Sequence, residues 1–197
     1  MNKSVALAIG LFVFFVAGIG AYFVTSNKQD EVLIPVEQPA GVEEVGFSLP
    51  DIAGVVRESS EWHGKARMIN FWATWCAPCR REIPLLKKTQ EEQAANNVQV
   101  IGIAVDFPEE VAAYAEEAQF NYPVLVGQED AMAIAETTGI EFIGMPFTMI
   151  VAPSGELIKA HIGEIVESHI EQILAVFEDL EQGRMDIAGA RSALGNL

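Results

Sequence analysis

The sequence predicts an α/β domain preceded by a single transmembrane helix. Apolar runs typical of buried strands alternate with segments of helical periodicity through most of the 197 residues. Ahead of them, residues 5–24 carry no charge and are long enough to cross a bilayer as a helix. Late in the chain, Pro153-Ser154-Gly155 is a turn signal between two strand-like runs and indicates a β-hairpin.

An N-terminal β-hairpin is predicted from short strands at 47–49 and 55–56 around a turn at 51–54. The remaining elements, in chain order, are a strand at 66–73, a helix at 76–95, a strand at 98–105, a helix at 109–118 opened by Pro108, a strand at 122–126, a helix at 131–137, strands at 147–151 and 157–162, and a helix at 166–180. The last helix has its apolar side chains on one face and is expected to cover the sheet.

The chain divides into an anchor at 1–27, a flexible tether at 28–45, the α/β domain at 46–183 and a tail at 184–197. The tether is polar and acidic and contains two prolines, which suits an extended linker. The tail has small side chains without a firm period, so a frayed helix or a disordered segment is expected there.

Lys3 and the amino terminus precede the uncharged run, so the amino terminus is expected to stay in the cytoplasm. A cleaved signal peptide is the alternative, but the run exceeds the usual apolar region and no clean small-x-small site closes it. The domain is therefore expected on the extracytoplasmic side of the cytoplasmic membrane, where disulfides persist.

The net charge of −16 excludes two classes of partner. Lys and Arg are too few and too scattered to form a stripe that follows phosphates. Nucleic acid and anionic lipid surfaces are therefore poor partners.

The two cysteines of the chain, Cys76 and Cys79, are separated by Ala77 and Pro78 and follow the strand predicted at 66–73. If a helix begins at Cys76, the two Cα atoms lie about 5 to 6 Å apart, within the range of a disulfide. The helix N-terminus stabilises a thiolate, so Cys76 is predicted to attack and Cys79 to resolve the mixed disulfide.

Three other uses of the cysteine pair compete with disulfide exchange: a structural disulfide, zinc binding and copper delivery. A structural bridge over so short a loop removes little entropy from the unfolded chain. Zinc needs two further ligands, and His63, His161 and His169 show no close ligand spacing, so no metal or cofactor is expected. A copper-delivery module that binds Cu(I) through both cysteines and a histidine stays open as an alternative.

The segment around the cysteines resembles the active-site segment of the thioredoxin superfamily, in its membrane-tethered TlpA/ResA-like branch. It reads Met68-Ile69-Asn70-Phe71-Trp72-Ala73-Thr74-Trp75-Cys76-Ala77-Pro78-Cys79-Arg80-Arg81-Glu82-Ile83-Pro84. The residues before Asp51, the segment 107–139 and Gly144-Met145-Pro146 resemble the same branch. The resemblance implies a thioredoxin fold, in which helices flank a central mixed sheet, with an N-terminal β-hairpin and a central helix–strand insertion. It also implies disulfide exchange outside the cytoplasm, often in cytochrome c assembly.

Glu82 is the candidate proton acceptor. It borders the apolar stripe of its helix one turn after Cys79, and a half-buried carboxylate there can take the proton from that thiol. The resemblance points the same way, because this branch keeps a functional acid three residues after its second cysteine. Ordinary thioredoxins carry a buried aspartate where this chain has Asn70, which favours Glu82 further.

Pro146 and its neighbours form the candidate substrate site. The resemblance implies a cis Met145–Pro146 bond beside the cysteines. Met145 then presents its backbone to an extended substrate segment, and Trp75 lines the groove.

The function expected is a membrane-anchored thiol–disulfide oxidoreductase that reduces disulfides of substrate proteins and is recharged by a transmembrane thiol reductant. An oxidant or isomerase of protein disulfides is the alternative within the class.

Overall fold

The computed structural model describes residues 44–139 and 143–197. Its centre is a mixed five-stranded sheet with the order β5-β4-β3-β6-β7. The strands are β3 (Ala66–Trp72), β4 (Val98–Val105), β5 (Val124–Gly127), β6 (Phe147–Val151) and β7 (Leu157–Ile162). Strands β3, β4 and β5 are parallel to one another, β6 pairs antiparallel with β3, and β7 pairs antiparallel with β6. This is the thioredoxin-like arrangement that the sequence predicts.

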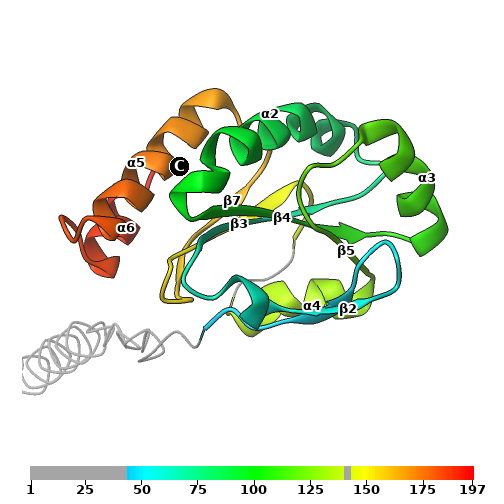
Figure 1. Cartoon of the computed structure of the whole chain (residues 1–197), viewed down its shortest axis with the longest axis horizontal. Coiled ribbons are helices and arrows are strands. Elements are labelled where there is room, and N and C mark those ends of the chain that lie inside the picture. Colours follow the sequence, from blue (N-terminus) through cyan, green and yellow to red (C-terminus); the bar gives the residue numbers. More distant parts are fainter. Residues whose placement is uncertain (1–43, 140–142) are drawn as a thin grey trace, which may run out of the picture. The chain divides into compact units, whose positions relative to one another are not determined.

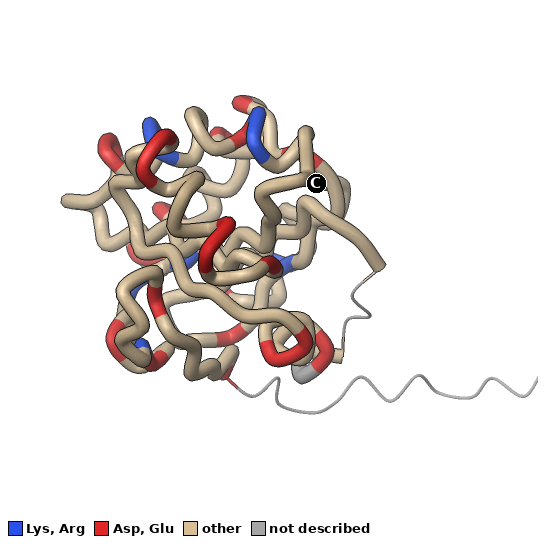
Figure 2. Tube along the Cα trace, turned by 90° about the vertical axis from the view of Figure 1, so that its right-hand side faces the viewer, with Lys and Arg blue, Asp and Glu red and all other residues tan. Residues whose placement is uncertain are grey.

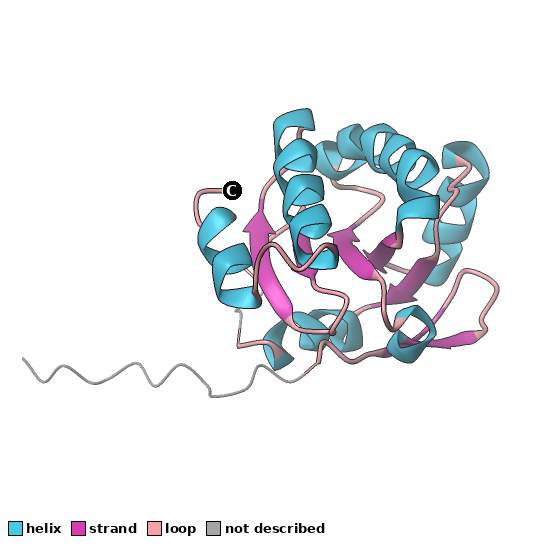
Figure 3. Cartoon of the chain, turned by 60° about the vertical axis from the view of Figure 1, so that its left-hand side comes forward, coloured by secondary structure: helices cyan, strands magenta, loops and turns pink. Residues whose placement is uncertain are grey.

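Helices cover both faces of this sheet (Figures 1 and 3). One core cluster joins the sheet to α2 (Ala77–Gln93), α3 (Pro108–Ala118), α5 (Glu167–Glu181) and α6 (Ile187–Ala193). A second cluster joins the other face to α4 (Glu129–Thr137) and to the N-terminal hairpin. Because both faces are covered, β3 is buried along its whole length, which explains its continuous apolar sequence.

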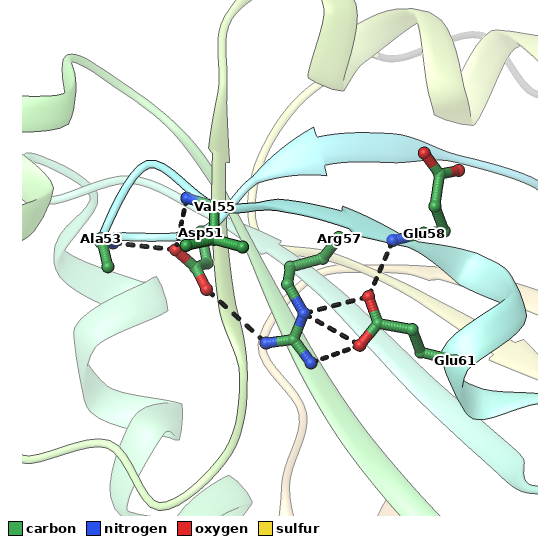
Figure 4. Close-up of polar contacts among 6 residues, drawn as sticks. All are labelled: Asp51, Ala53, Val55, Arg57, Glu58 and Glu61. Atoms are coloured by element: carbon green, nitrogen blue, oxygen red, sulfur yellow. Dashed lines mark hydrogen bonds and ion pairs between the residues drawn. The ribbon is translucent and has the colours of Figure 1, made fainter.

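The predicted N-terminal hairpin consists of β1 (Ser48–Pro50) and β2 (Val56–Glu58), followed by the short 3₁₀ helix η1 (Ser59–Trp62). Polar contacts hold its turn, as Figure 4 shows. Asp51 Oδ1 accepts the backbone N–H groups of Ala53 and Val55 at 2.9 and 3.0 Å. Arg57 lies 3.6 Å from Asp51 and donates to Glu61 at 2.9 Å, which joins the turn to η1.

Three predicted boundaries shift for local reasons. Helix α2 begins at Ala77 because Cys76 occupies the N-cap, and it ends at Gln93, where the 3₁₀ turn η2 (Ala94–Asn96) takes over. Strand β5 begins only after Pro123, which has no N–H group to donate to a ladder. The expected helix–strand insertion corresponds to α3 and β5.

The C-terminal segment corrects the prediction of a frayed or disordered tail. Residues 187–193 form α6, and Ala190 and Leu194 are fully buried in the core cluster that contains α5. Arg191 Nη2 donates to the carbonyl of Leu157 in β7 at 3.0 Å. The partly buried Met185, Ile187 and Leu197 also pack on this core, and Lys159 of β7 donates to the carbonyl of Gly195. These contacts to other elements hold the short helix although its sequence has no detectable period. The core of the domain therefore extends past residue 183.

The domain also begins slightly before residue 46. Val45 is buried, and its N–H donates to the carbonyl of Gly155 at 3.0 Å, so this last residue of the predicted tether belongs to the fold. The predicted anchor and the rest of the tether lie outside the described residues. Within residues 44–139 and 143–197, no helix has both the length and the apolar character needed to cross a membrane.

Acidic side chains dominate the surface of the described domain. Figure 2 shows Asp and Glu positions distributed over the trace, with few Lys and Arg positions among them. This distribution agrees with the net charge of −16.

Candidate active site

Cys76 and Cys79 form a disulfide at the start of α2, with their Cα atoms 5.3 Å apart. Cys76 is the N-cap residue, and its sulfur accepts the N–H of Cys79 at 3.3 Å. Cys76 is 5% exposed, whereas Cys79 is fully buried. Cys76, at the helix end, is therefore the more accessible of the two residues.

The start of α2 favours a thiolate on Cys76. N–H groups in the first turn of a helix have no intrahelical partner, and the helix dipole adds partial positive charge there. Pro78 fits this first turn because its missing N–H group would have been unpaired. Arg80 and Arg81 are exposed, and Arg81 is paired with Glu164, so no arginine is buried against the sulfurs.

Glu82 is buried more completely than its half-buried prediction, with only 1% of its surface exposed. Its Oε1 accepts a hydrogen bond from Asn70 Nδ2 at 2.8 Å, and its Oε2 accepts the N–H of Ile165 at 2.6 Å. Burial raises the pKa of Glu82 to about 7 by disfavouring the charged form, and these two hydrogen bonds oppose part of the rise. The carboxyl group can therefore gain or lose a proton near neutral pH.

The Met145–Pro146 peptide bond is cis, which confirms that expectation. Pro146 is buried at the start of β6, and its carbonyl accepts the N–H of Gly163 at 2.9 Å. Because β6 pairs with β3, the strand that leads to the cysteines, Pro146 lies at the same end of the sheet. Trp75 is 70% exposed beside Cys76, as a residue that contacts substrate must be.

Sequence reasoning missed Asp106, which holds the loop before the cysteines. Its Oδ2 accepts both the N–H and the hydroxyl of Thr74, at 2.9 and 2.6 Å, and its Oδ1 accepts the N–H of Phe107. The available signal was a single acidic residue directly after the apolar run of β4. The backbone donors at Ile165 and Gly163 were also missed, because backbone groups leave no trace in sequence patterns.

The histidines lie apart from the sulfur chemistry. His63 contacts Glu44, and the rings of His161 and His169 are tilted by 59° relative to each other with their centroids 4.7 Å apart. In the described part of the chain, no three histidine, cysteine, aspartate or glutamate side chains converge in a way that suits a metal ion.

Known proteins resemble this chain in sequence and in fold. A sequence model of the AhpC/TSA family matches residues 41–160. The thiol-disulfide oxidoreductase ResA of Halalkalibacterium halodurans is 29% identical over 140 residues, which cover 71% of this chain and 77% of ResA. ResA of Geobacillus kaustophilus is 25% identical over 157 residues, which cover 79% of this chain and 86% of that protein.

A solved structure agrees with these sequence relatives. The thiol:disulfide interchange protein of Chlorobium tepidum, of the thioredoxin family, superimposes with a TM-score of 0.61 at 27% identity. The superposition covers 69% of this chain and 97% of that structure.

The chain belongs to the AhpC/TSA family of thioredoxin-like proteins. Its disulfide at the start of α2 and its ResA relatives place it among the thiol–disulfide oxidoreductases, in the TlpA/ResA-like branch.

The raised pKa of Glu82 predicts a pH-dependent stability of the oxidised protein. The folded-state pKa, about 7, lies above the ordinary value of 4.5, so the folded protein binds the extra proton between these limits. The unfolding free energy is therefore expected to fall as pH rises through this window, by on the order of 3 kcal/mol. Glu82→Gln should flatten the curve obtained from denaturant titrations, whereas Glu91→Gln, an exposed site on the same helix, should not. Parallel curves for wild type and Glu82→Gln would contradict the assignment.

Proposed function

We propose that this oxidoreductase reduces disulfides of substrate proteins outside the cytoplasm. The observation that carries the proposal is the Cys76–Cys79 pair at the start of α2, with a buried carboxyl group one turn further along. In the reduced protein, the Cys76 thiolate attacks one sulfur of the substrate disulfide, and the other substrate sulfur leaves as a thiolate. Cys79 then attacks Cys76, which releases the second substrate sulfur and oxidises the pair by two electrons.

Glu82 serves the second step. Cys79 is fully buried and must lose its proton before it attacks. Glu82 follows Cys79 by three residues in α2, so both side chains lie on the same side of the helix. A carboxylate with a pKa of about 7 is matched to accept a proton near neutral pH.

The direction of electron flow follows from the charges around Cys76. A strong oxidant needs a very acidic attacking cysteine, whose stable thiolate favours the reduced pair. Here the helix terminus supports the thiolate, but Arg81 is engaged by Glu164, and neither Arg80 nor Arg81 is buried against the pair. The negative charge of ionised Glu82 disfavours a second anion. The balance favours a reductase.

The order of attack can be tested by trapping in cells. Cys79→Ser should accumulate mixed disulfides with substrate proteins, because the resolving sulfur is absent. Cys76→Ser should accumulate none, since no attacking thiolate is left. Non-reducing gels and mass spectrometry of the trapped species would measure this and identify the substrates. The reverse pattern would exclude Cys76 as the attacking residue.

The reductase assignment predicts a midpoint potential nearer to thioredoxin's, about −270 mV, than to the strongly oxidising limit of about −120 mV. Equilibration of the purified protein with glutathione or dithiothreitol, followed by alkylation of free thiols, measures it. A value above about −180 mV would instead favour the oxidant or isomerase alternative.

We infer that residues 1–27 anchor the domain to the cytoplasmic membrane, with the catalytic domain on the outer side. The uncharged run at 5–24 behind Lys3 supports this placement. A transmembrane thiol reductant then supplies the electrons, because the domain is separated from cytoplasmic reductants. A fusion of alkaline phosphatase after Leu197 should be active and remain with the membrane fraction. An inactive fusion would contradict this orientation, and release of the active fusion would indicate a cleaved signal peptide.

The resemblance to the TlpA/ResA-like branch supports one substrate class, the apoproteins of cytochrome c. Their paired cysteines must be reduced before haem attachment, which is the reaction a protein-disulfide reductase provides. The species trapped by Cys79→Ser test this assignment directly.

A further inference from the structure

Two large aromatic side chains are more than half exposed in the described part of the chain. Among its exposed large apolar residues, Trp75 (70%) and Phe107 (55%) are the only aromatic ones. Trp75 belongs to the loop before Cys76, whereas Phe107 is the N-cap residue of α3, in the helix–strand insertion. Single exposed apolar residues are common on protein surfaces, so the question is whether these two lie together.

The strand register brings them to the same place. Parallel strands β3 and β4 pair residue by residue up to Trp72 and Ala104. Two residues beyond this last pair, in the segments that follow β3 and β4, the N–H and the hydroxyl of Thr74 donate to Asp106 Oδ2. Trp75 and Phe107 are the next residues after this linked pair, so the two loops carry an exposed aromatic residue at corresponding positions next to the Thr74–Asp106 contact.

Asp106 makes this juxtaposition rigid. Its carboxylate is 7% exposed and accepts three hydrogen bonds, two from Thr74 and one from the N–H of Phe107 at 2.8 Å. Its own N–H donates to the carbonyl of Gly127 in β5 at 3.1 Å. The backbone around Phe107 is therefore fixed to the loop that leads to Cys76, and hydrogen bonds to a carboxylate are among the stronger ones.

The order of the strands places Cys76 between Phe107 on one side and Pro146 on the other. Strand β4, which leads to Phe107, lies on one side of β3, and β6, which begins after Pro146, lies on the other. Cys76 follows β3 itself. A substrate segment that lies across these strand ends with its cysteine at Cys76 therefore meets Pro146 on one side and Phe107 on the other.

We propose that Phe107 is a specificity-determining residue that, together with Trp75, binds an apolar side chain of the substrate next to its reactive cysteine. The substrate class is thus a disulfide in an extended segment with an apolar residue on the side of the cysteine remote from Pro146. The proposal rests on the proposed function. A substrate protein lies against this end of the sheet because Cys76 attacks its disulfide.

The test measures single-turnover reduction of three peptide disulfides by the reduced full-length protein. Each substrate is the symmetric disulfide of a short peptide with one cysteine. The first has serines around the cysteine, the second has leucine two residues before it, and the third has leucine two residues after it. Each turnover oxidises the Cys76/Cys79 dithiol and yields two peptide thiols, which are quantified after acid quenching.

With wild type, one leucine peptide should react about tenfold faster than the serine peptide, the discrimination expected when an apolar pocket gains one aliphatic side chain. Phe107→Ala should reduce this ratio to about one- to twofold, and Phe107→Leu should retain most of it. Val56→Ala is the matched control, because Val56 is similarly exposed (60%) but lies in the N-terminal hairpin. This variant should keep the wild-type ratio.

The outcomes separate the two proposals. Equal rates for all three peptides with wild type, or an unchanged ratio in Phe107→Ala, would overturn the role of Phe107 and leave the reductase function standing. Failure of the reduced wild-type protein to reduce any peptide would count against the proposed function itself.

Discussion

The pairing of β3 with a parallel neighbour on one side and an antiparallel neighbour on the other determines where every part of the site lies. The carboxyl ends of β3 and β4 and the amino end of β6 meet at one edge of the sheet. Cys76, Asp106 and Pro146 each follow or precede one of these ends by a few residues. The site therefore needs no long loop to assemble, because three neighbouring strand ends deliver its residues.

A second constraint is the burial of Glu82 under these strands. A carboxylate without contact to water is costly, and its neighbours compensate only in part. Asn70 from β3 and the backbone of Ile165 each donate one hydrogen bond, but no cation is paired with Glu82 in the described structure. The pKa of Glu82 is therefore raised only to about 7, which suits reversible proton transfer at neutral pH. Under the proposed function, the stability given up at this residue serves proton transfer from Cys79.

The sequence predicted the structure best where the local surroundings of a residue determine which amino acid can stand there. The continuous apolar runs of β3 and β4 predicted those strands almost to the residue, because both faces of each strand are covered. The cysteine spacing and the proline of the first helical turn predicted the start of α2 for similarly local reasons. The packed helix α6 was not predicted, because Ala190 and Leu194 hold it through tertiary contacts that give the sequence no helical hydrophobic period. The role of Asp106 and the hydrogen bond from Asn70 to Glu82 were not predicted, because in each case the partner lies far away in sequence and only the folded structure reveals it.

The segment from Gly163 to Ile165 connects two parts of the site that are far apart in sequence. Its first residue donates to the carbonyl of Pro146, and its last donates to Glu82. A hydrogen bond to a carboxylate is about twice as strong as one to a neutral acceptor, so each proton that Glu82 takes up loosens one end of this segment. The three residues therefore join the backbone beside Pro146 to a carboxyl group whose charge changes near neutral pH.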